Sequence, residues 1–377
     1  MKEGQNLKKI IAFIKKEIVL SAAWLLAVIS AFFVHPDAEY LDYIDWRTLG
    51  ILWGLMVIMK GLSKNHVFDM AGNALLKKTG KSRQLCTILI MLCFFCSMFI
   101  TNDVSLITFV PFAMMVLKSI NKENLIIPVL VLQTIAANLG SMLTPIGNPQ
   151  NLFLYGLSGA GIGEFVLIML PYTVISLLMI LVGIMLLPGN KEKISIAGSS
   201  VKHEFSKTDI AFYFVLFVLA LAVVTRFVHY LVLVGAVLIY VLVSDRKLIL
   251  KADYILLLTF VGFFIFTGNM ARIDAVSEVL SKLISGKEIL VGAAVSQVIS
   301  NVPAALLLSG FTENLRGLLI GVNIGGLGTL IASMASLITY KAYCNEYPEG
   351  KGKFFRLFTA ENIIGLVVLG IAAIFVN

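Results

Sequence analysis

The chain is a series of long apolar runs separated by short polar or basic segments. Many of these runs approach the roughly 20 apolar residues that a helix needs to cross a membrane. Spanning segments are predicted over residues 18–34, 46–59, 124–155, 164–187, 209–226, 231–243, 252–270, 314–340 and 358–376. The pattern therefore predicts an all-α polytopic membrane protein with nine spans.

Polar residues interrupt the apolar sequence at four places where a membrane is driest. A freed backbone group costs several kcal/mol in hydrocarbon, so such interruptions occur where protein or a cavity satisfies them, as in many transporters. The four interruptions are the turn Thr101-Asn102-Asp103 of a hairpin over 84–118, a helix break within 138–151, the turn Ser300-Asn301-Val302 of a hairpin over 288–310, and a helix break within 322–333. The hairpin arms are short for spans, which favours re-entrant hairpins.

The hairpin and the break occur twice in the same order. Residues 296–303 match residues 97–104 at a shift of 199, and residues 322–331 match residues 137–146 at a shift of 185. Lys and Arg in the short loops place the first hairpin on the cytoplasmic side and the second on the opposite side. The chain is therefore predicted to be an inverted repeat with two re-entrant hairpins and two broken helices, an architecture found in secondary transporters.

The repeat defines the predicted domain organisation. Two amphipathic segments, 65–78 and 272–285, are predicted to lie along the membrane surface. The first repeat covers 1–187, with a scaffold and interfacial arm at 46–80 and a hairpin plus broken helix at 84–187. A cytoplasmic linker is predicted over 188–208. The second repeat covers 209–377, with a scaffold and arm at 209–285 and a hairpin plus broken helix at 288–377.

Composition and charge agree with a membrane location. The chain is 59% apolar and 14% charged, with a mean hydropathy of +0.93, whereas soluble domains are about a quarter charged. The net charge of +8 comes from Lys and Arg in loops and in the basic segment 1–17, which predicts topology and no nucleic-acid partner. We expect an inner (plasma) membrane protein with a cytoplasmic N-terminus and an external C-terminus.

Oxygen atoms at the four interruptions are suited to a hard cation such as Na⁺. Asn and hydroxyl side chains and the carbonyl groups of glycine supply them. The candidate cation-binding residues are Thr101, Asn102, Asp103, Asn138, Gly140, Ser300, Asn301, Asn323 and Gly325. We expect Na⁺ or H⁺ as the coupling ion and no other cofactor.

The half-helices that follow the breaks offer free N–H groups and a positive dipole end, which suit a small anion. The candidate substrate-binding residues are Asn102, Thr144, Pro145, Gly147, Asn148, Asn301, Thr329 and Ser333. No Lys or Arg is close to these breaks in the sequence. An anion is therefore expected to depend on helix dipoles or on the bound cation.

Asp103 is the one carboxylate at a predicted hairpin turn, and its counterpart in the second copy is Val302. An ionisable residue at membrane depth is a functional hypothesis by default. Asp103 is expected to bind a cation or to carry a proton. The alternative is that it only caps the helix that begins at Val104. Similarly, Asn138 and Asn323 have the alternative role of hydrogen bonding between helices.

The motifs Ile100-Thr-Asn-Asp, Gly140-Ser-Met-Leu-Thr-Pro-Ile-Gly-Asn-Pro-Gln-Asn and Ile299-Ser-Asn-Val-Pro resemble those of the ion transporter superfamily. That group includes divalent-anion/sodium symporters and the arsenite-efflux and sodium/proton antiporter permeases. The resemblance covers most of the chain from Trp46 onward. It implies a homodimer in which a transport domain slides past a scaffold, as in an elevator, with the segments 65–78 and 272–285 as linking arms.

The resemblance also implies two sodium sites. Thr101 and Asn102 would serve one, Ser300 and Asn301 the other, and the helix breaks would complete them. The chain departs from the symporters because Asp103 and Val302 stand where those proteins have Thr. This departure favours an arsenite-type or antiporter relative over a dicarboxylate symporter.

We therefore predict a secondary active transporter of a small anion, coupled to Na⁺ or H⁺. Its partners would be the anion, the cation and membrane lipid. The alternatives are a sodium/proton antiporter or an arsenite-type efflux permease that uses Asp103. A channel is a further alternative, and saturable, coupled flux would distinguish it. An enzyme is not expected, because no metal cluster, nucleophile–base pair or paired carboxylates occupy one span.

Overall fold

The computed structural model describes residues 17–76, 79–188 and 205–376. Residues 1–16 of the predicted basic segment 1–17, residues 77 and 78 of the predicted arm 65–78, and residues 189–204 of the predicted linker 188–208 lie outside these residues. The α-helices are α2 (Ile18–Ala31), α3 (Glu39–Asp42), α4 (Trp46–Lys64), α5 (Val67–Leu76), α6 (Ser82–Ile100), α7 (Asn102–Ser119), α8 (Ile126–Ser141), α9 (Pro149–Ser158), α10 (Ile162–Leu186), α11 (Lys207–Val224), α12 (Tyr230–Ser244), α13 (Tyr254–Ala271), α14 (Asp274–Ile284), α15 (Glu288–Ile299), α16 (Asn301–Leu308), α17 (Leu315–Ile324), α18 (Met334–Glu346) and α19 (Lys351–Val376). Short 3₁₀ turns occupy Glu123–Leu125, Arg246–Lys251, Ser309–Phe311 and Pro348–Gly350.

The helix ends fall at the predicted interruptions. The first hairpin is α6–α7, with its turn at Thr101, and the second is α15–α16, with its turn at Ser300. The first broken helix is α8–α9 and the second is α17–α18. Pro149 at the first position of α9 fits this break, because proline is tolerated where no helical N–H bond is needed. The amphipathic segments form α5 and α14, which were predicted as surface arms.

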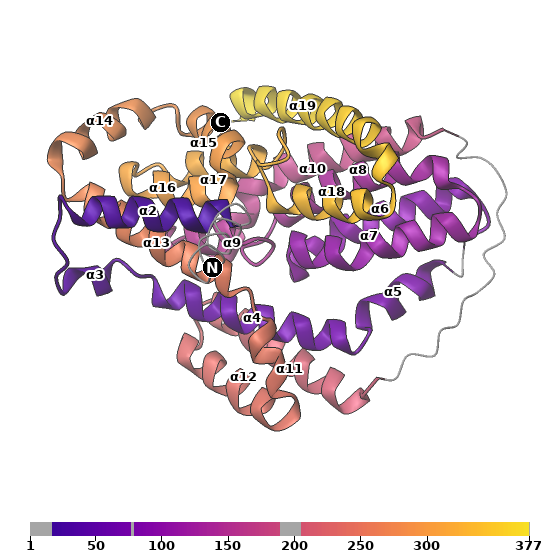
Figure 1. Ribbon diagram of the computed structural model, residues 1–377, viewed down its shortest axis with the longest axis horizontal. Helices are drawn as coiled ribbons and strands as arrows, with labels where there is room; N and C mark the ends of the chain where they lie inside the picture. The colour runs from indigo at the N-terminus through magenta and orange to yellow at the C-terminus, as the bar shows by residue number, and fades with distance from the viewer. Residues whose placement is uncertain (1–16, 77–78, 189–204, 377) are drawn as a thin grey trace, which may run out of the picture.

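Each broken helix shares its two halves between the two hairpins. α8 packs on α6 and α7, but α9, which follows it in sequence, packs on α16 and α17. Conversely, α17 packs on α15 and α16, whereas α18 packs on α7 and α8. Figure 1 shows the consequence: α9 lies among the helices of the second hairpin, and α18 lies against α7. At each break, the chain therefore passes from the helices of one hairpin to the helices of the other.

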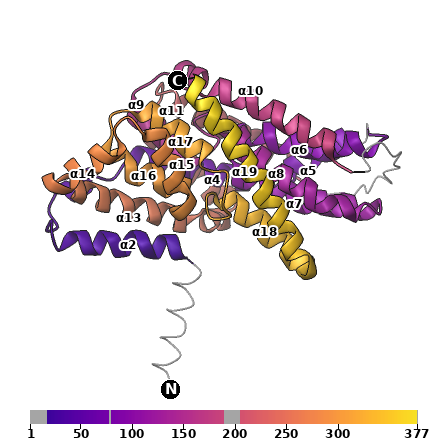
Figure 2. The same ribbon diagram turned by 90° about the horizontal axis from the view of Figure 1, so that it is seen from above.

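The remaining helices surround this centre. α4 packs against α11 and α12, and α2 packs along α13. Figure 2 shows α2 and α13 side by side at one end, and α19 running diagonally across the middle. The centre is thus formed by the hairpins and breaks, and α4 passes close to it.

Six helical segments within the described residues are long and apolar enough to cross a membrane, by length and composition. They are Ser82–Ile100, Glu123–Ser141, Ile162–Leu186, Lys207–Val224, Tyr254–Ala271 and Pro348–Val376. The apolar helices α2, α12, α15 and α17 are shorter, because turns or breaks end them. These findings support a polytopic membrane protein, and the count of nine spans stays a prediction.

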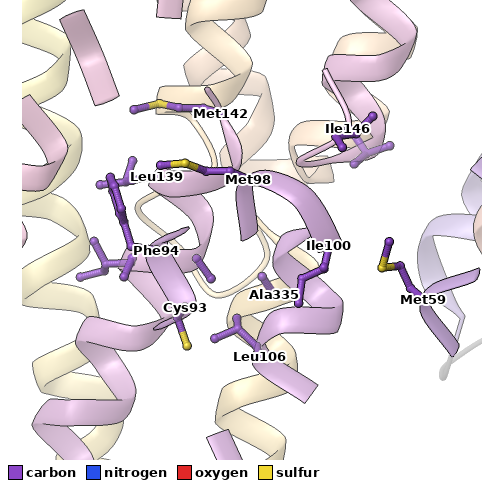
Figure 3. Close-up of a cluster of buried hydrophobic side chains, with 14 of the residues drawn as sticks. Met59, Cys93, Phe94, Met98, Ile100, Leu106, Leu139, Met142, Ile146 and Ala335 are labelled. Carbon is purple, nitrogen blue, oxygen red and sulfur yellow. The ribbon is translucent and has the colours of Figure 1, made fainter. Parts of the chain in front are cut away.

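The first hairpin and α8 meet without space between their backbones. A Cβ on Gly140 would lie 2.0 Å from the carbonyl oxygen of Phe94, so only glycine permits this approach. Figure 3 shows the apolar side chains around this contact, where Met98 of the hairpin lies near Leu139 and Met142. This packing holds the first turn beside the first break.

Candidate functional site

The first hairpin turn is held against the first helix break by two hydrogen bonds. The backbone N–H of Asn102 donates to the carbonyl oxygen of Gly147 at 3.1 Å. The hydroxyl of Thr144 donates to the carbonyl oxygen of Met98. Thr101 itself has φ 68° and ψ 150°, a region that is costly for a β-branched residue. The turn therefore holds a strained backbone conformation that its contacts with the break maintain.

The second hairpin turn repeats this arrangement. The backbone N–H of Asn301 donates to the carbonyl oxygen of Ala332 at 2.9 Å. The hydroxyl of Thr329 donates to the backbone carbonyl oxygen of Gln297 at 3.0 Å. Ser300 has φ 78° and ψ 155°. Every one of these residues corresponds to its first-copy counterpart at the shifts of 199 and 185 found in the sequence.

Two further hydrogen bonds join one break to the other. The hydroxyl of Ser333 donates to Asn138 Oδ1 at 2.9 Å. Asn148 Nδ2 donates to Asn323 Oδ1 at 3.3 Å. Asn138 corresponds to Asn323, and Asn148 corresponds to Ser333, at the same shift of 185. The asparagine that ends the first half of each broken helix thus contacts the residue that caps the second half of the other.

Asn138 is the centre of this network. Its Oδ1 also accepts a hydrogen bond from Asn102 Nδ2 at 3.1 Å, which links the first hairpin turn to both breaks. Its Nδ2 is buried and has no hydrogen-bond partner among the described residues, and the same holds for the hydroxyl of Ser336 in the first turn of α18. Buried polar groups are normally satisfied, so these two groups are available to a ligand or water.

Two half-helices begin at this network. Asn148 caps α9 by accepting from the N–H of Asn151 at 3.1 Å, and Ser333 caps α18 by accepting from the N–H of Ala335 at 3.3 Å. Each helix therefore directs its positive dipole end toward the place where the breaks meet. The electrostatic field there favours a small anion or the carboxylate of a substrate.

Asp103 lies beside this network and faces a cavity of about 100 Å³. The hypothesis that it only caps a helix beginning at Val104 is wrong. The cap of α7 is Thr101, whose hydroxyl accepts from the N–H of Val104, and Asp103 lies in the first helical turn. The carboxylate is therefore free of that role and remains half-buried.

The expectation that no Lys or Arg approaches the breaks is also wrong. Lys60 of α4 lines the same cavity as Asp103 and Asn148. The sequence places Lys60 more than 40 residues from the hairpin turn, and its position near the end of a span made it look like a cytoplasmic topology residue. Only the packing of α4 beside the centre brings this charge to the site.

Apart from Asp103, which faces the cavity, the candidate residues separate into three groups by their surroundings. Those in or next to the hydrogen-bonded network are Thr101, Asn102, Asn138, Thr144, Gly147, Asn148, Ser300, Asn301, Asn323 and Ser333. Gly140, Gly325 and Pro145 are buried, and a Cβ on Gly325 would lie 2.7 Å from the Cα of Ala293, which indicates close packing. Thr329 is exposed and bonds only within its own copy.

Three polar residues of the network were not among the candidates. Gln297 Nε2 donates to the carbonyl oxygens of Gly325 and Leu327, at 2.9 Å each. Asn151 Oδ1 accepts from Asn323 Nδ2 at 2.7 Å, and Ser141 Oγ accepts from Asn148 Nδ2 at 3.1 Å. Ser141 and Asn151 stand within the first break and Gln297 stands three residues before the second turn, so their positions could have indicated them.

The comparisons with known proteins identify the family of the chain. The model of the citrate transporter family CitMHS matches residues 10–317. An uncharacterized transporter of Methanocaldococcus jannaschii is 36% identical over 311 residues, which cover 80% of this chain and 82% of that protein. An inner membrane protein of Escherichia coli is 32% identical, covering 79% of this chain and 80% of that protein.

A more distant match is a putative arsB transporter of Dictyostelium discoideum. It is 26% identical over 134 residues, which are 36% of this chain and 23% of that protein. The resemblance to the ion transporter superfamily is confirmed, and the chain is a membrane transporter and not an enzyme. The chain belongs to the CitMHS citrate transporter family.

Proposed function

We propose that the protein is a secondary active transporter that moves a small anion across the inner membrane, coupled to Na⁺ or H⁺. The observation that carries this proposal is the reciprocal contact between the two breaks, Asn138 with Ser333 and Asn323 with Asn148. It supports a substrate site shared by both copies. A site of this kind opens to one side or the other when the part of the protein that holds it moves against the rest, which is alternating access.

The anion would bind at the meeting of α9 and α18. Asn138 Nδ2 and the Ser336 hydroxyl are buried there without partners in the described part of the chain. Two amide or hydroxyl donors and two helix N-termini form a suitable environment for a carboxylate or an oxyanion. The family description names citrate, so a polycarboxylate is the first substrate class to test.

The coupling cation would bind at the first hairpin turn. Asp103 supplies a carboxylate, and Thr101 and Asn148 supply oxygen atoms that line the same cavity. Oxygen ligands of this type suit Na⁺, and a carboxylate also accepts a proton. The second turn, with Val302 in place of Asp103, would contribute carbonyl, amide and hydroxyl oxygens but no carboxylate.

A second candidate function is an arsenite-type efflux permease or a sodium/proton antiporter. The observation that favours it is the carboxylate of Asp103 at the turn, where the symporters that the chain resembles have Thr. A relative is named as an arsB transporter. In this alternative Asp103 exchanges cations and the helix N-termini hold no polycarboxylate.

We further propose that transport is of the elevator type and that the protein is a homodimer. The hairpins and broken helices, at 84–187 and 288–377, would move as the transport domain. The helices α5 and α14 would link this domain to the scaffold. The helices α4, α11 and α12, which pack on one another, would belong to that scaffold.

The test is transport by the purified protein in proteoliposomes. Labelled citrate and arsenite are supplied with an inward sodium gradient, an inward proton gradient or neither. The proposal expects saturable accumulation of one anion that depends on one of the gradients. Saturable sodium/proton exchange without anion movement would replace it by the antiporter. Flux that follows the anion gradient alone and does not saturate would indicate a channel.

A further inference from the structure

The cavity beside Asp103 contains charges that the anion site does not use. It lies between α4, α7, the start of α9 and the start of α13, and its walls are mostly Leu, Ile and Met side chains. Three charged residues line it: Asp103 of α7, Lys60 of α4 and Asp253 just before α13. They come from three parts of the chain that are distant in sequence, so the fold alone brings them together.

The three charges share the cavity without touching one another. Within the described residues, no ion pair of 4.0 Å or less joins any of them. The carboxylate of Asp253 caps α13 by accepting from the N–H of Leu256 at 2.9 Å. Lys60 and Asp103 are half-buried, whereas Asp253 is exposed. The cavity is thus lined by one exposed carboxylate, one half-buried ammonium group and one half-buried carboxylate next to the breaks.

The size of the cavity restricts what enters it. A volume of about 100 Å³ is enough for several water molecules. Pockets that take small organic molecules measure roughly 300–1,000 Å³. The cavity therefore suits water, a proton or a partly hydrated monovalent cation, and it is too small for a polycarboxylate.

We propose that this cavity is the route by which the coupling cation reaches Asp103, and that Lys60 competes with that cation for the carboxylate. Without a cation, the ammonium group of Lys60 balances the charge of Asp103. When Na⁺ or a proton binds Asp103, it neutralises the carboxylate, and the positive charge of Lys60 repels the bound cation. Lys60 thereby sets the cation affinity. This inference depends on the proposed function, because it assumes that Asp103 binds the coupling cation.

The location of Lys60 makes this competition useful for transport. Lys60 is on α4, which packs with α11 and α12, whereas Asp103 is on the hairpin that would move. A movement of the hairpin along α4 would separate the two charges. The cation would then be held more tightly on one side of the membrane than on the other, which is how a coupling ion is released in one direction.

The experiment is cation-dependent thermal stabilisation of the purified full-length protein. NaCl is titrated against choline chloride at constant ionic strength, and a parallel series varies the proton concentration. Lys60→Met removes the charge and keeps the length of the side chain, and Lys60→Arg keeps the charge. Because charges in one cavity act on each other through space, removing the unit charge of Lys60 is expected to change the cation affinity by about tenfold.

We expect Lys60→Met to lower the half-saturating concentration of Na⁺ or of protons by about tenfold, and Lys60→Arg to stay near wild type. The matched control is Lys64→Met, one turn along α4. Lys64 pairs with Asp245 at 2.8 Å and does not line the cavity, so its loss should leave the half-saturating concentration unchanged.

The outcomes separate this inference from the function on which it depends. Cation stabilisation that is lost in Asp103→Asn but unchanged in Lys60→Met would overturn the role of Lys60 and leave the cation site in place. An unchanged response in Asp103→Asn would overturn the cation site itself. A response that changes equally in Lys60→Met and Lys64→Met would show a general effect of charge and would also contradict the competition.

Discussion

The two hairpin turns differ in chemistry but share one framework. Both have a strained residue, Thr101 or Ser300, and in both the next N–H bonds the break of its own copy. The third position differs: Asp103 faces a cavity, whereas Val302 is 9% exposed and belongs to the apolar core. The framework is therefore a property of both copies, and the charge that could couple transport to a cation belongs to the first.

This difference shows which part of such a site can vary. The hydrogen bonds that hold each turn use backbone groups and Thr144 or Thr329, so they do not depend on the residue at the third position. A carboxylate can be present in one copy and absent in the other without loss of the fold. The two copies can be compared by mutation at three places: the close backbone contacts, the strained turn residues and the hydrogen bonds between the breaks.

The largest effect is expected where the first hairpin packs on its break. Gly140→Ala would place a Cβ 2.0 Å from the backbone oxygen of Phe94, and Gly325→Ala would place one 2.7 Å from the Cα of Ala293. Forcing atoms into a filled core costs about 1–3 kcal/mol, occasionally more. We expect Gly140→Ala to lower the free energy of unfolding by about 3 kcal/mol or more, and Gly325→Ala to lower it by less. Both effects are measured as a lower melting temperature and a lower yield of folded protein.

The control for this prediction is Gly235→Ala in α12, where a Cβ would meet nothing within 4 Å. It should be neutral or stabilising by up to about 1 kcal/mol, because alanine favours a helix more than glycine does. Equal melting temperatures for Gly140→Ala and Gly235→Ala would contradict the close contact of the first hairpin with its break.

A smaller effect of opposite sign is expected at the strained residues. Thr101→Gly relieves a conformation that costs about 1–3 kcal/mol, offset by the roughly 0.5–1 kcal/mol entropy cost of glycine. The hydroxyl of Thr101 makes only a 3.5 Å contact with the N–H of Val104. Thr101→Gly should therefore raise the unfolding free energy by about 1 kcal/mol, measured in detergent by thermal or denaturant unfolding.

The comparison with the second turn sharpens this prediction. The hydroxyl of Ser300 donates to the carbonyl oxygen of Ala332 at 3.3 Å, and Ser300→Gly loses that bond. It should stabilise less than Thr101→Gly. Thr101→Ala is the control, since it removes the hydroxyl and retains the strain. If Thr101→Gly and Thr101→Ala lower the free energy of unfolding equally, the backbone conformation of Thr101 is not strained.

The smallest effect is expected for the bonds between the breaks. Double-mutant cycles for the pairs Asn138/Ser333 and Asn323/Asn148, each changed to Ala, measure the two couplings separately. Hydrogen bonds between membrane helices average about 0.6 kcal/mol. The bond of 2.9 Å should couple more strongly than the bond of 3.3 Å. Zero coupling in both pairs would contradict the reciprocal contact.

Much of the helical pattern was predictable from the sequence. The hairpin turns and helix breaks were found because Asn, Gly and Pro cannot stay in hydrocarbon without partners, and the same residues mark their counterparts. The first hairpin arms, predicted over 84–118, form α6 and α7 with ends at Ser82 and Ser119. The positions of polar residues within apolar runs therefore predicted where the turns and breaks of the site lie.

The parts that were missed depend on tertiary packing. The sequence gives no indication that α4 passes beside the first turn, so Lys60 was excluded from the site. Nor does it show that α9 leaves its own copy to pack on α16 and α17, which creates the contact of Asn148 with Asn323. The role of Asp103 was also left open, because a capping residue and a cation ligand look alike in a sequence.

We propose that the charge that couples transport to a cation belongs to the first turn alone. The most direct measurement is the current evoked by a jump in sodium or proton concentration on a solid-supported membrane with the reconstituted protein. We expect a saturable current in wild type and in Val302→Ala and no such current in Asp103→Asn, with all three proteins equally folded by size-exclusion chromatography. A current of unchanged size in Asp103→Asn would contradict it.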